Sequence, residues 1–396
     1  MSKVFYPLAS SSWNKEEINS MNSVIRSRNF KMGSHVKIFE NKFAEFIGSK
    51  YAVMVNSGSS ANLLMFAALL LRKRKKIKRK DEIIVPAISW STTYSPIQQL
   101  DLRLKFVDVD PKTLNFDLTD LQKKISSKTK VIVAVNLLGN SNNFYSIKKI
   151  IGKRKIILLE DNCESLGAKY RGKMSGTFGL MGTFSFFYSH HISTMEGGLI
   201  STNSKELYQI LLSIRSHGWT RDLPKKNLVS SFKKRNKFSE MFRFVLPGFN
   251  VRPLELCGAI GVNQLQKLPT LLKKRRKNAE IFKKEFSKLE YFSTQHEIGL
   301  SSWFGFAIIL KKSAPFSRKK VLDILERNKI EYRPIVAGNF SRSESLKWFN
   351  HANTKNYKNA DFIDKNGFFV GNHGFDISKK IRKLALLLRK LEIAYL

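Results

Sequence analysis

The sequence predicts an α/β protein with a largely parallel sheet, followed by a smaller α+β domain. First, short runs rich in Val and Ile alternate with helix-length segments between about residues 50 and 200. Second, the pattern changes near residue 255, where a long segment rich in Leu, Lys and Glu begins. Third, neither a repeat nor a low-complexity linker separates the two parts, so we expect residues 1–270 and 271–396 to form closely packed domains.

Each predicted element follows from a local pattern. The predicted sheet strands are residues 51–55, 82–85, 105–109, 131–135 and 155–159, which are short, apolar and rich in β-branched side chains. The second part reads as a helix over 255–289, a strand over 303–310, a helix over 319–328 and an amphipathic helix from about residue 381. Because parallel strands end at one edge of a sheet, catalytic groups are expected there.

The chain carries a large positive charge, because 70 basic residues outnumber 31 acidic ones and give a net charge of +39. Such a charge raises nucleic-acid binding as a hypothesis. The densest run, residues 72–80, lies between an apolar helix-like segment and a predicted strand, which is typical of a solvated loop. The other basic clusters are scattered, so we predict a lysine-rich surface that helps attract an anionic substrate, and no nucleic-acid partner.

The sequence favours a cytoplasmic protein without a membrane partner. Its longest clean apolar run, residues 63–71, is about half the length that a membrane span requires. The N-terminus lacks a long apolar signal core. The two cysteines, Cys163 and Cys257, are too few for a disulfide framework or a four-thiolate iron–sulfur cluster, and we expect both to be reduced.

A phosphate-binding motif follows the first predicted strand. Residues 56–61, Asn-Ser-Gly-Ser-Ser-Ala, open a helix, so the backbone and hydroxyls at Gly58 and Ser59 can bind a phosphate. An ordinary capped helix start explains this motif equally well. Ser185, at the end of a later strand, is a further candidate phosphate donor.

Two other side chains match what a flat, charged ring needs. Asp161 ends a buried strand, where an unpaired carboxylate would be costly unless a pyridinium, a helix cap or an ion pair satisfies it. Trp90 follows another strand and can stack on a ring, with core packing as the alternative. Together with the phosphate motif, these groups indicate a site for pyridoxal 5′-phosphate (PLP).

The most informative segment, residues 184–198, contains His190 and His191 before a Glu-Gly-Gly turn. It resembles the segment in which sugar aminotransferases carry a lysine that holds PLP as a Schiff base and moves protons. No lysine lies between Lys173 and Lys205, and imidazole only moves protons. Adjacent residues of an extended segment point to opposite sides, so we expect one histidine at the ring and the other in a structural hydrogen bond.

Taken together, these motifs resemble the DegT/DnrJ/EryC1/StrS group of fold-type-I PLP enzymes over essentially the whole chain. The matching stretches are residues 6–11, 51–59, 85–94, 160–165, 189–198, 217–224, 248–255 and 333–336. The resemblance implies an aminotransferase-like large domain with a mostly parallel, seven-stranded type of sheet. It also implies PLP and pyridoxamine 5′-phosphate (PMP) as cofactors.

Position by position, the resemblance assigns roles to residues of this chain. His190 takes the lysine position and is the implied base, while Glu164 corresponds to a residue near the ring hydroxyl. The implied cofactor contacts are Gly58, Ser59 and Ser185 at the phosphate, Trp90 on the ring, Asp161 at the ring nitrogen, and Asn250 across a homodimer interface with shared active sites. The implied substrate contacts are Arg28, Asn29, Phe30, Lys31, His217, Arg221, Arg252 and Arg333.

The resemblance is strongest to a histidine-bearing branch that removes the C3 hydroxyl of a GDP-linked 4-keto-6-deoxymannose, in colitose formation for O-antigen lipopolysaccharide. L-Glutamate is the implied amino donor, and the products are the 3,6-dideoxy sugar nucleotide, 2-oxoglutarate and ammonia. The missing lysine argues against the alternative of a sugar 4-aminotransferase. Two distant cysteines argue against a dehydratase that needs an iron–sulfur cluster and a reductase partner. The set Asp161, Glu164, His190 and His217 argues against a silent scaffold or a basic nucleic-acid binder.

Overall fold

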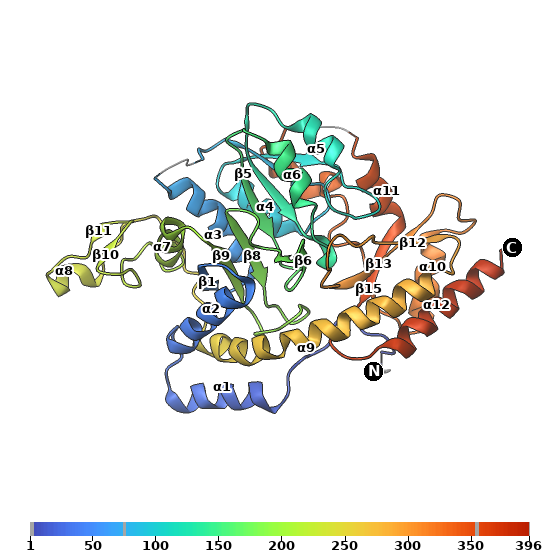
Figure 1. The fold of residues 1–396 in the computed structure, drawn as a ribbon, viewed down its shortest axis with the longest axis horizontal. Coiled ribbons are helices and arrows are strands. Elements are labelled where there is room, and N and C mark those ends of the chain that lie inside the picture. Colours follow the sequence, from blue (N-terminus) through green and yellow to red (C-terminus); the bar gives the residue numbers. More distant parts are fainter. Residues whose placement is uncertain (1–3, 74–76, 353–355, 396) are drawn as a thin grey trace.

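The computed structural model describes residues 4–73, 77–352 and 356–395, and its centre is a seven-stranded sheet (Figure 1). The sheet order is β1-β9-β8-β5-β4-β2-β3. Its strands are β1 Tyr51–Val55, β2 Glu82–Pro86, β3 Arg103–Val107, β4 Thr129–Val135, β5 Ile157–Asp161, β8 Met181–Ser185 and β9 Gly198–Thr202. Only β9 runs against its neighbours, so the predicted mostly parallel sheet is confirmed.

Helices cover both faces of this sheet, because successive strand side chains point to opposite sides. The helices are α2 Ser34–Ile47, α3 Gly58–Leu71, α4 Ser91–Gln99, α5 Leu118–Lys124, α6 Phe144–Ile151 and α7 Lys205–Ile214. Val131 and Val133 of β4 pack in one core with side chains of α3, α4 and α7. Ile132 and Ala134 pack in a second core with α5 and α6. Strands buried on both faces explain the continuous apolar runs of the sequence.

The smaller domain is a four-stranded antiparallel sheet with helices. Its elements are β12 Phe292–Thr294, β13 Gly305–Leu310, β14 Tyr332–Arg333, β15 Gly367–Gly371, α10 Arg318–Arg327, α11 Lys358–Asn366 and α12 Ser378–Ile393. The N-terminal end of the chain joins this domain, since the Tyr6 hydroxyl donates to the Gly371 carbonyl at 2.7 Å inside its core.

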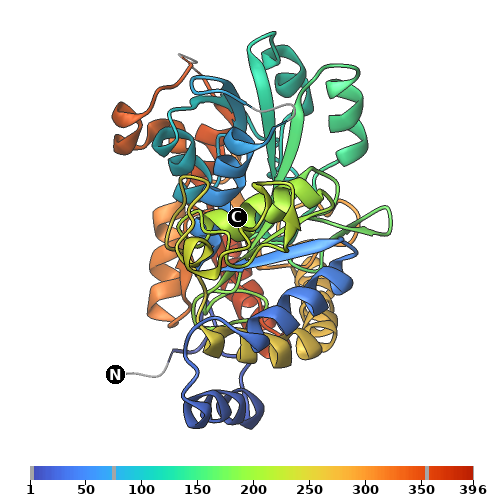
Figure 2. The same cartoon turned by 90° about the vertical axis from the view of Figure 1, so that its left-hand side faces the viewer.

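One long helix, α9 Glu255–Phe286, packs against both domains and passes through residue 270 without a break. It lies against α1 Lys15–Ser27 in both views (Figures 1 and 2) and also packs on α2 and α12. The division between residues 1–270 and 271–396 stays a prediction, because this helix contributes to both cores.

The remaining elements are short. They are β6 Lys169–Tyr170, β7 Lys173–Met174, β10 Lys226–Asn227, β11 Ser231–Phe232, α8 Lys237–Met241, and the 3-10 turns Leu137–Gly139, Phe340–Arg342 and Glu344–Trp348. The arm formed by β10, β11 and α8 projects from the body (Figure 1). Residues 74–76 of the basic run lie outside the described residues, and residues 78–80 beside them are exposed. Within the described ranges, no helix is long and apolar enough to cross a membrane.

Candidate active site

A cavity of about 450 Å³ lies where the parallel strands end. The segments that follow β1, β2, β4, β5 and β8 form its floor and walls, as expected for a sheet of this type. Phe304, Arg333 and Phe369 line it from the smaller domain. The cavity therefore lies between the two domains and is lined by side chains from both.

The N-terminus of α3 forms one corner of this cavity. Ser57 caps the helix by accepting from the Ser60 N–H at 3.0 Å, and the Ser59 hydroxyl donates to Thr92 at 2.9 Å. Gly58 packs so tightly that an added Cβ would stand 2.6 Å from Cβ of Ser185. The positive end of the helix dipole, free amides and hydroxyls together suit a phosphate, with glycine required for the close approach.

Asp161, at the end of β5, is held by donors from three segments. Its carboxylate accepts from Asn62 Nδ2 at 2.9 Å, the Thr93 hydroxyl at 2.8 Å and the Cys163 N–H at 3.1 Å. In turn, the Thr183 hydroxyl donates to Asn62 at 2.7 Å. No cationic side chain of the described residues pairs with this carboxylate, so a protonated ring nitrogen in the cavity would complete its environment.

Trp90 stands at the start of α4 with 57% of its surface exposed, and it lines the cavity. A tryptophan with more than half of its surface exposed is not part of the hydrophobic core, so the alternative that Trp90 is a core-packing residue is wrong. Its indole is therefore free to cover one face of a flat ring.

The two adjacent histidines have different surroundings. His190 lines the cavity, whereas His191 is 2% exposed and its Nε2 lies 3.1 Å from the Ser302 carbonyl. The Phe304 ring packs against both imidazoles, with centroids at 5.2 and 5.8 Å. One imidazole faces the cavity and the other is hydrogen-bonded away from it, as expected, but the extended segment from which this was predicted is wrong: residues 188–192 form turns and bends, with the His190 N–H donating to the Phe187 carbonyl.

His190 remains neutral well below neutral pH. Burial lowers its pKa to about 4, and the positive charge of Arg275 adds to this effect. Arg275 is 6% exposed and has no carboxylate partner within the described part of the chain. It donates to the carbonyls of Trp303, Phe304 and Asn372. The imidazole is therefore neutral at neutral pH, and its buried Nδ1 has no hydrogen-bond partner among the described residues.

Glu164 is a second titratable group in the cavity. It accepts from the Leu138 N–H at 2.9 Å, and burial together with the nearby Asp161 charge raises its pKa to about 7. Glu160, four residues earlier in β5, is fully buried outside the cavity lining, where it accepts from the N–H groups of residues 176, 178 and 179. Glu160, inside β5, thus has a structural role, whereas Glu164, three residues after the strand ends, lines the cavity with its raised pKa.

The cavity collects Gly58, Ser59, Trp90, Asp161, Glu164, Ser185, His190 and Arg333 of the residues that the sequence singled out. The other predicted contacts lie outside its lining. His217, Asn250 and Arg252 group at the base of the arm, where Arg252 Nε donates to Asn250 Oδ1 at 3.2 Å. The Arg221 guanidinium stacks on Trp219 at 5.0 Å. Arg28, Asn29, Phe30 and Lys31 form an exposed turn after α1. Roles for these residues remain predictions.

Sequence reasoning missed several residues that support the site. Asn62 and Thr93 hold Asp161, Phe304 packs on His190, and Arg275 lies behind both histidines. A signal existed for two of them, because Asn62 is one turn after Gly58 on the same helix face and Thr93 is three residues after Trp90. For Phe304 and Arg275 no local pattern indicated a role.

Comparison with known proteins identifies the family. The family model of the DegT/DnrJ/EryC1/StrS aminotransferases matches residues 11–369. The chain belongs to this family. This confirms the resemblance that the sequence motifs indicated.

Other members of the DegT/DnrJ/EryC1/StrS family are similar over nearly their whole length. The GDP-4-keto-6-deoxy-D-mannose 3-dehydratase of Yersinia pseudotuberculosis is 55% identical over 386 residues, covering 97% of this chain and 98% of that protein. The E. coli enzyme of this name, solved with bound hydrated PLP, is 56% identical with a TM-score of 0.96, covering 97% and 99% of the two chains. A crystal structure of the same enzyme type with a trapped PLP-glutamate geminal diamine has a TM-score of 0.95 at 56% identity, covering 97% and 100%.

Proposed function

We propose that this protein is a PLP- and PMP-dependent 3-dehydratase of GDP-4-keto-6-deoxy-D-mannose that uses L-glutamate as amino donor. The observation that carries the proposal is the identity of the group at the reacting end of the cavity. His190 is there, and no lysine is among the described residues that line the cavity. Relatives at 55–56% identity that bear this enzyme name support the assignment of the substrate.

The cavity fits the proposed cofactor in its donor chemistry. The tight cradle at Gly58 with Ser59 and Ser185 would hold the phosphate, Trp90 would cover the ring, and Asp161 would meet the ring nitrogen. When bound, the cofactor supplies the amino group that joins sugar C4 and a ring that accepts electrons. A lysine-free cavity leaves it held by noncovalent contacts alone.

The chain's own groups then account for the proton movements. Neutral His190 removes a proton from the C4′ carbon of the cofactor, which allows the C3 hydroxyl of the sugar to leave. Asp161 keeps the ring nitrogen protonated, which stabilises the developing charge. Glu164, with its pKa of about 7, exchanges protons near the ring hydroxyl. Arg333, in the cavity wall, binds a carboxylate or phosphate oxygen of a substrate.

We also propose a homodimer in which the partner's Asn250 completes each site. Asn250 is exposed and outside the cavity of its own chain, and the neighbouring arm exposes Phe232, Phe238 and Phe242 by 60, 84 and 67%. Apolar side chains grouped in this way favour a protein interface. The His190→Asn and Asn250→Ala chains, tested alone and coexpressed, decide this: a shared site makes each variant inactive alone and restores activity in the mixed dimer, while an active Asn250→Ala protein or an inactive mixed dimer contradicts it.

The decisive experiment combines the purified protein, PLP, L-glutamate and GDP-4-keto-6-deoxymannose. A 3-dehydratase yields a nucleotide sugar lighter by one oxygen atom, with 2-oxoglutarate and ammonia in equal amounts. The runner-up, a 4-aminotransferase, yields an amino sugar that keeps its C3 hydroxyl and releases no ammonia. The latter product would overturn the proposal, and omission of glutamate is the control. We place the reaction in the cytoplasm, where nucleotide sugars and glutamate are available.

A further inference from the structure

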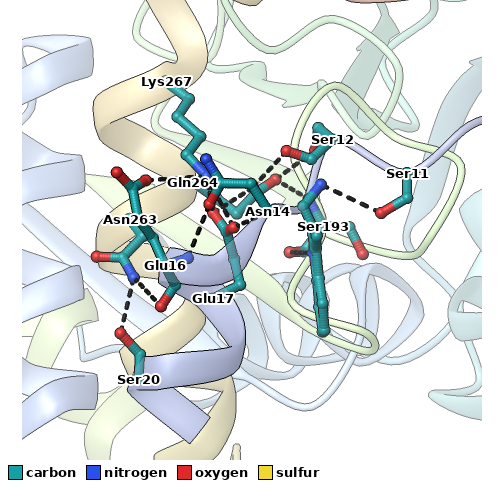
Figure 3. Close-up of polar contacts among 11 residues, drawn as sticks. Ser11, Ser12, Asn14, Glu16, Glu17, Ser20, Ser193, Asn263, Gln264 and Lys267 are labelled. Atoms are coloured by element: carbon teal, nitrogen blue, oxygen red, sulfur yellow. Dashed lines mark hydrogen bonds and ion pairs between the residues drawn. The ribbon is translucent and has the colours of Figure 1, made fainter.

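The loop that carries His190, residues 186–197, is fixed from outside the cavity through Ser193. The Ser193 N–H donates to Gln264 Oε1 at 3.1 Å, and its carbonyl accepts from Trp13 Nε1 at 3.0 Å. Both backbone polar groups of this residue are therefore held by segments remote in sequence. Figure 3 shows Gln264 reaching from α9 toward Ser193, beside the N-terminal segment that precedes α1.

Gln264 is the centre of a buried polar network. It is fully buried, its Oε1 also accepts from the Ser12 hydroxyl at 2.6 Å, and its Nε2 donates to Glu17 at 2.7 Å. Glu17, also fully buried, pairs with Lys267 at 2.6 Å (Figure 3). Because both polar ends of the Gln264 amide are satisfied, the amide has one preferred position, and that position dictates where the Ser193 N–H lies.

Through this loop, the position of Ser193 constrains the position of the His190 imidazole. The loop is closed by the Thr194 N–H donating to the Phe186 carbonyl at 2.9 Å, and the His190 N–H donates to Phe187 at 2.9 Å. Only two residues, His191 and Ile192, separate Ser193 from His190, so a displaced anchor has little chain in which to relax. His191, between them, is held at Ser302.

The same face of α9 supports the other side of the loop. Arg275 lies eleven residues after Gln264, and eleven residues are within about 20° of three full helical turns. It holds the carbonyls of Trp303 and Phe304, and the Phe304 ring packs on His190. One rigid helix thus positions the loop from two directions.

We propose that Gln264 is a positioning residue for the base: acting through Ser193, it sets where the His190 imidazole stands in the cavity, with the N-terminal segment as its brace. This inference rests on the proposed function in taking His190 as the base. Gln264 touches neither substrate nor cofactor, so its loss leaves binding intact and slows the proton transfer. A misplacement of about 1 Å costs on the order of 100-fold in rate, and we expect kcat to fall by about 10- to 100-fold with KM nearly unchanged.

The test compares Gln264→Met with Asn263→Ala. Methionine keeps the length of the side chain and removes all of its hydrogen bonds, to Ser193, Ser12 and Glu17. Asn263 is the matched control, because it also joins α9 to α1, through the Glu16 carbonyl at 3.0 Å and Ser20 at 2.7 Å, without reaching the loop (Figure 3). Trp13→Phe is the second variant, since it removes only the donor to the Ser193 carbonyl.

Three readouts are needed: kcat and KM, hydrogen exchange of the peptide covering residues 186–197, and the rate at which diethyl pyrocarbonate modifies His190. We expect Gln264→Met to lower kcat, speed exchange and change the modification rate, with Asn263→Ala close to wild type in all three. Equal effects from both variants, or an unchanged loop in Gln264→Met, would overturn the proposal. If Gln264→Met does not fold, faster exchange of this peptide in Trp13→Phe supports the proposal and unchanged exchange refutes it. A wild type without dehydratase activity refutes the proposed function, while exchange and modification still decide the positioning role.

Discussion

Acidification from about pH 7.5 to about pH 5.5 should leave His190 neutral, although an ordinary histidine is mostly protonated at the lower pH. The cause is its place in the cavity wall, where burial and the Arg275 charge lower its pKa to about 4. With that pKa about 3% of the imidazole is protonated at about pH 5.5, compared with about 90% for a pKa of about 6.5. The proposed base therefore stays available across this range.

The lowered pKa of His190 also makes the free energy of unfolding depend on pH. The folded-state pKa lies below that of the unfolded chain, so the unfolded chain binds more protons between about pH 6.5 and pH 4. The stabilising contribution of neutral His190 is therefore complete above about pH 6.5 and is lost as the pH falls. By linkage, about 1.4 kcal/mol is lost on going from about pH 7.5 to about pH 5.5.

Two measurements check this reasoning. Diethyl pyrocarbonate reacts with neutral imidazole, so the modification rate of His190, identified by its absence in His190→Asn, should stay constant down to about pH 5. The unfolding free energy of wild type, measured in urea relative to His190→Asn, should fall by about 1.4 kcal/mol between the two pH values. A modification midpoint near the ordinary histidine pKa, with no pH-dependent difference in unfolding, would refute the electrostatic account.

Three further predictions concern the same site. His190→Asn should abolish dehydration, while cofactor binding, followed by the absorbance of the cofactor, stays largely intact. His191→Asn loses the hydrogen bond to Ser302 and should mainly lower Tm. Equal and complete loss of activity from both variants would contradict the division of roles. Borohydride treatment of the holoenzyme should leave no pyridoxyl group on an active-site lysine. In His190→Lys, a covalent link between the new lysine and the cofactor should form and shift the absorbance of the cofactor. No shift would mean that position 190 does not face the cofactor. Gly58→Ala should weaken cofactor binding at least about tenfold, because the new Cβ would meet Ser185, and unchanged titration of the cofactor would exclude the proposed phosphate cradle.

Much of the site could be predicted from the sequence, because its motifs consist of residues that are close together in the chain. Gly58 and Trp90 follow an apolar strand within a few residues and Asp161 ends one, and parallel strands bring their ends to one edge of a sheet. The different surroundings of the two histidines were also expected, but the reason given was wrong, because residues 188–192 form turns and bends and not an extended segment. Local pattern and sheet geometry were sufficient for Gly58, Trp90 and Asp161.

The contacts that support His190 could not be predicted from the sequence, because they join segments that are far apart in the chain. Arg275 lowers the pKa of His190 by its charge and donates to the carbonyls of residues 303 and 304, and Gln264 reaches Ser193 across 71 positions. No periodicity of α9 distinguishes these two polar residues from others on a lysine-rich helix. The sequence by itself determined the order of strands and helices, the strand-end motifs and the replacement of lysine by histidine, since these depend on neighbouring residues. Only the tertiary structure decided which histidine faces the cavity, how far its pKa falls and what holds it in place, because burial, charge and hydrogen-bond partners there come from the packing of distant segments.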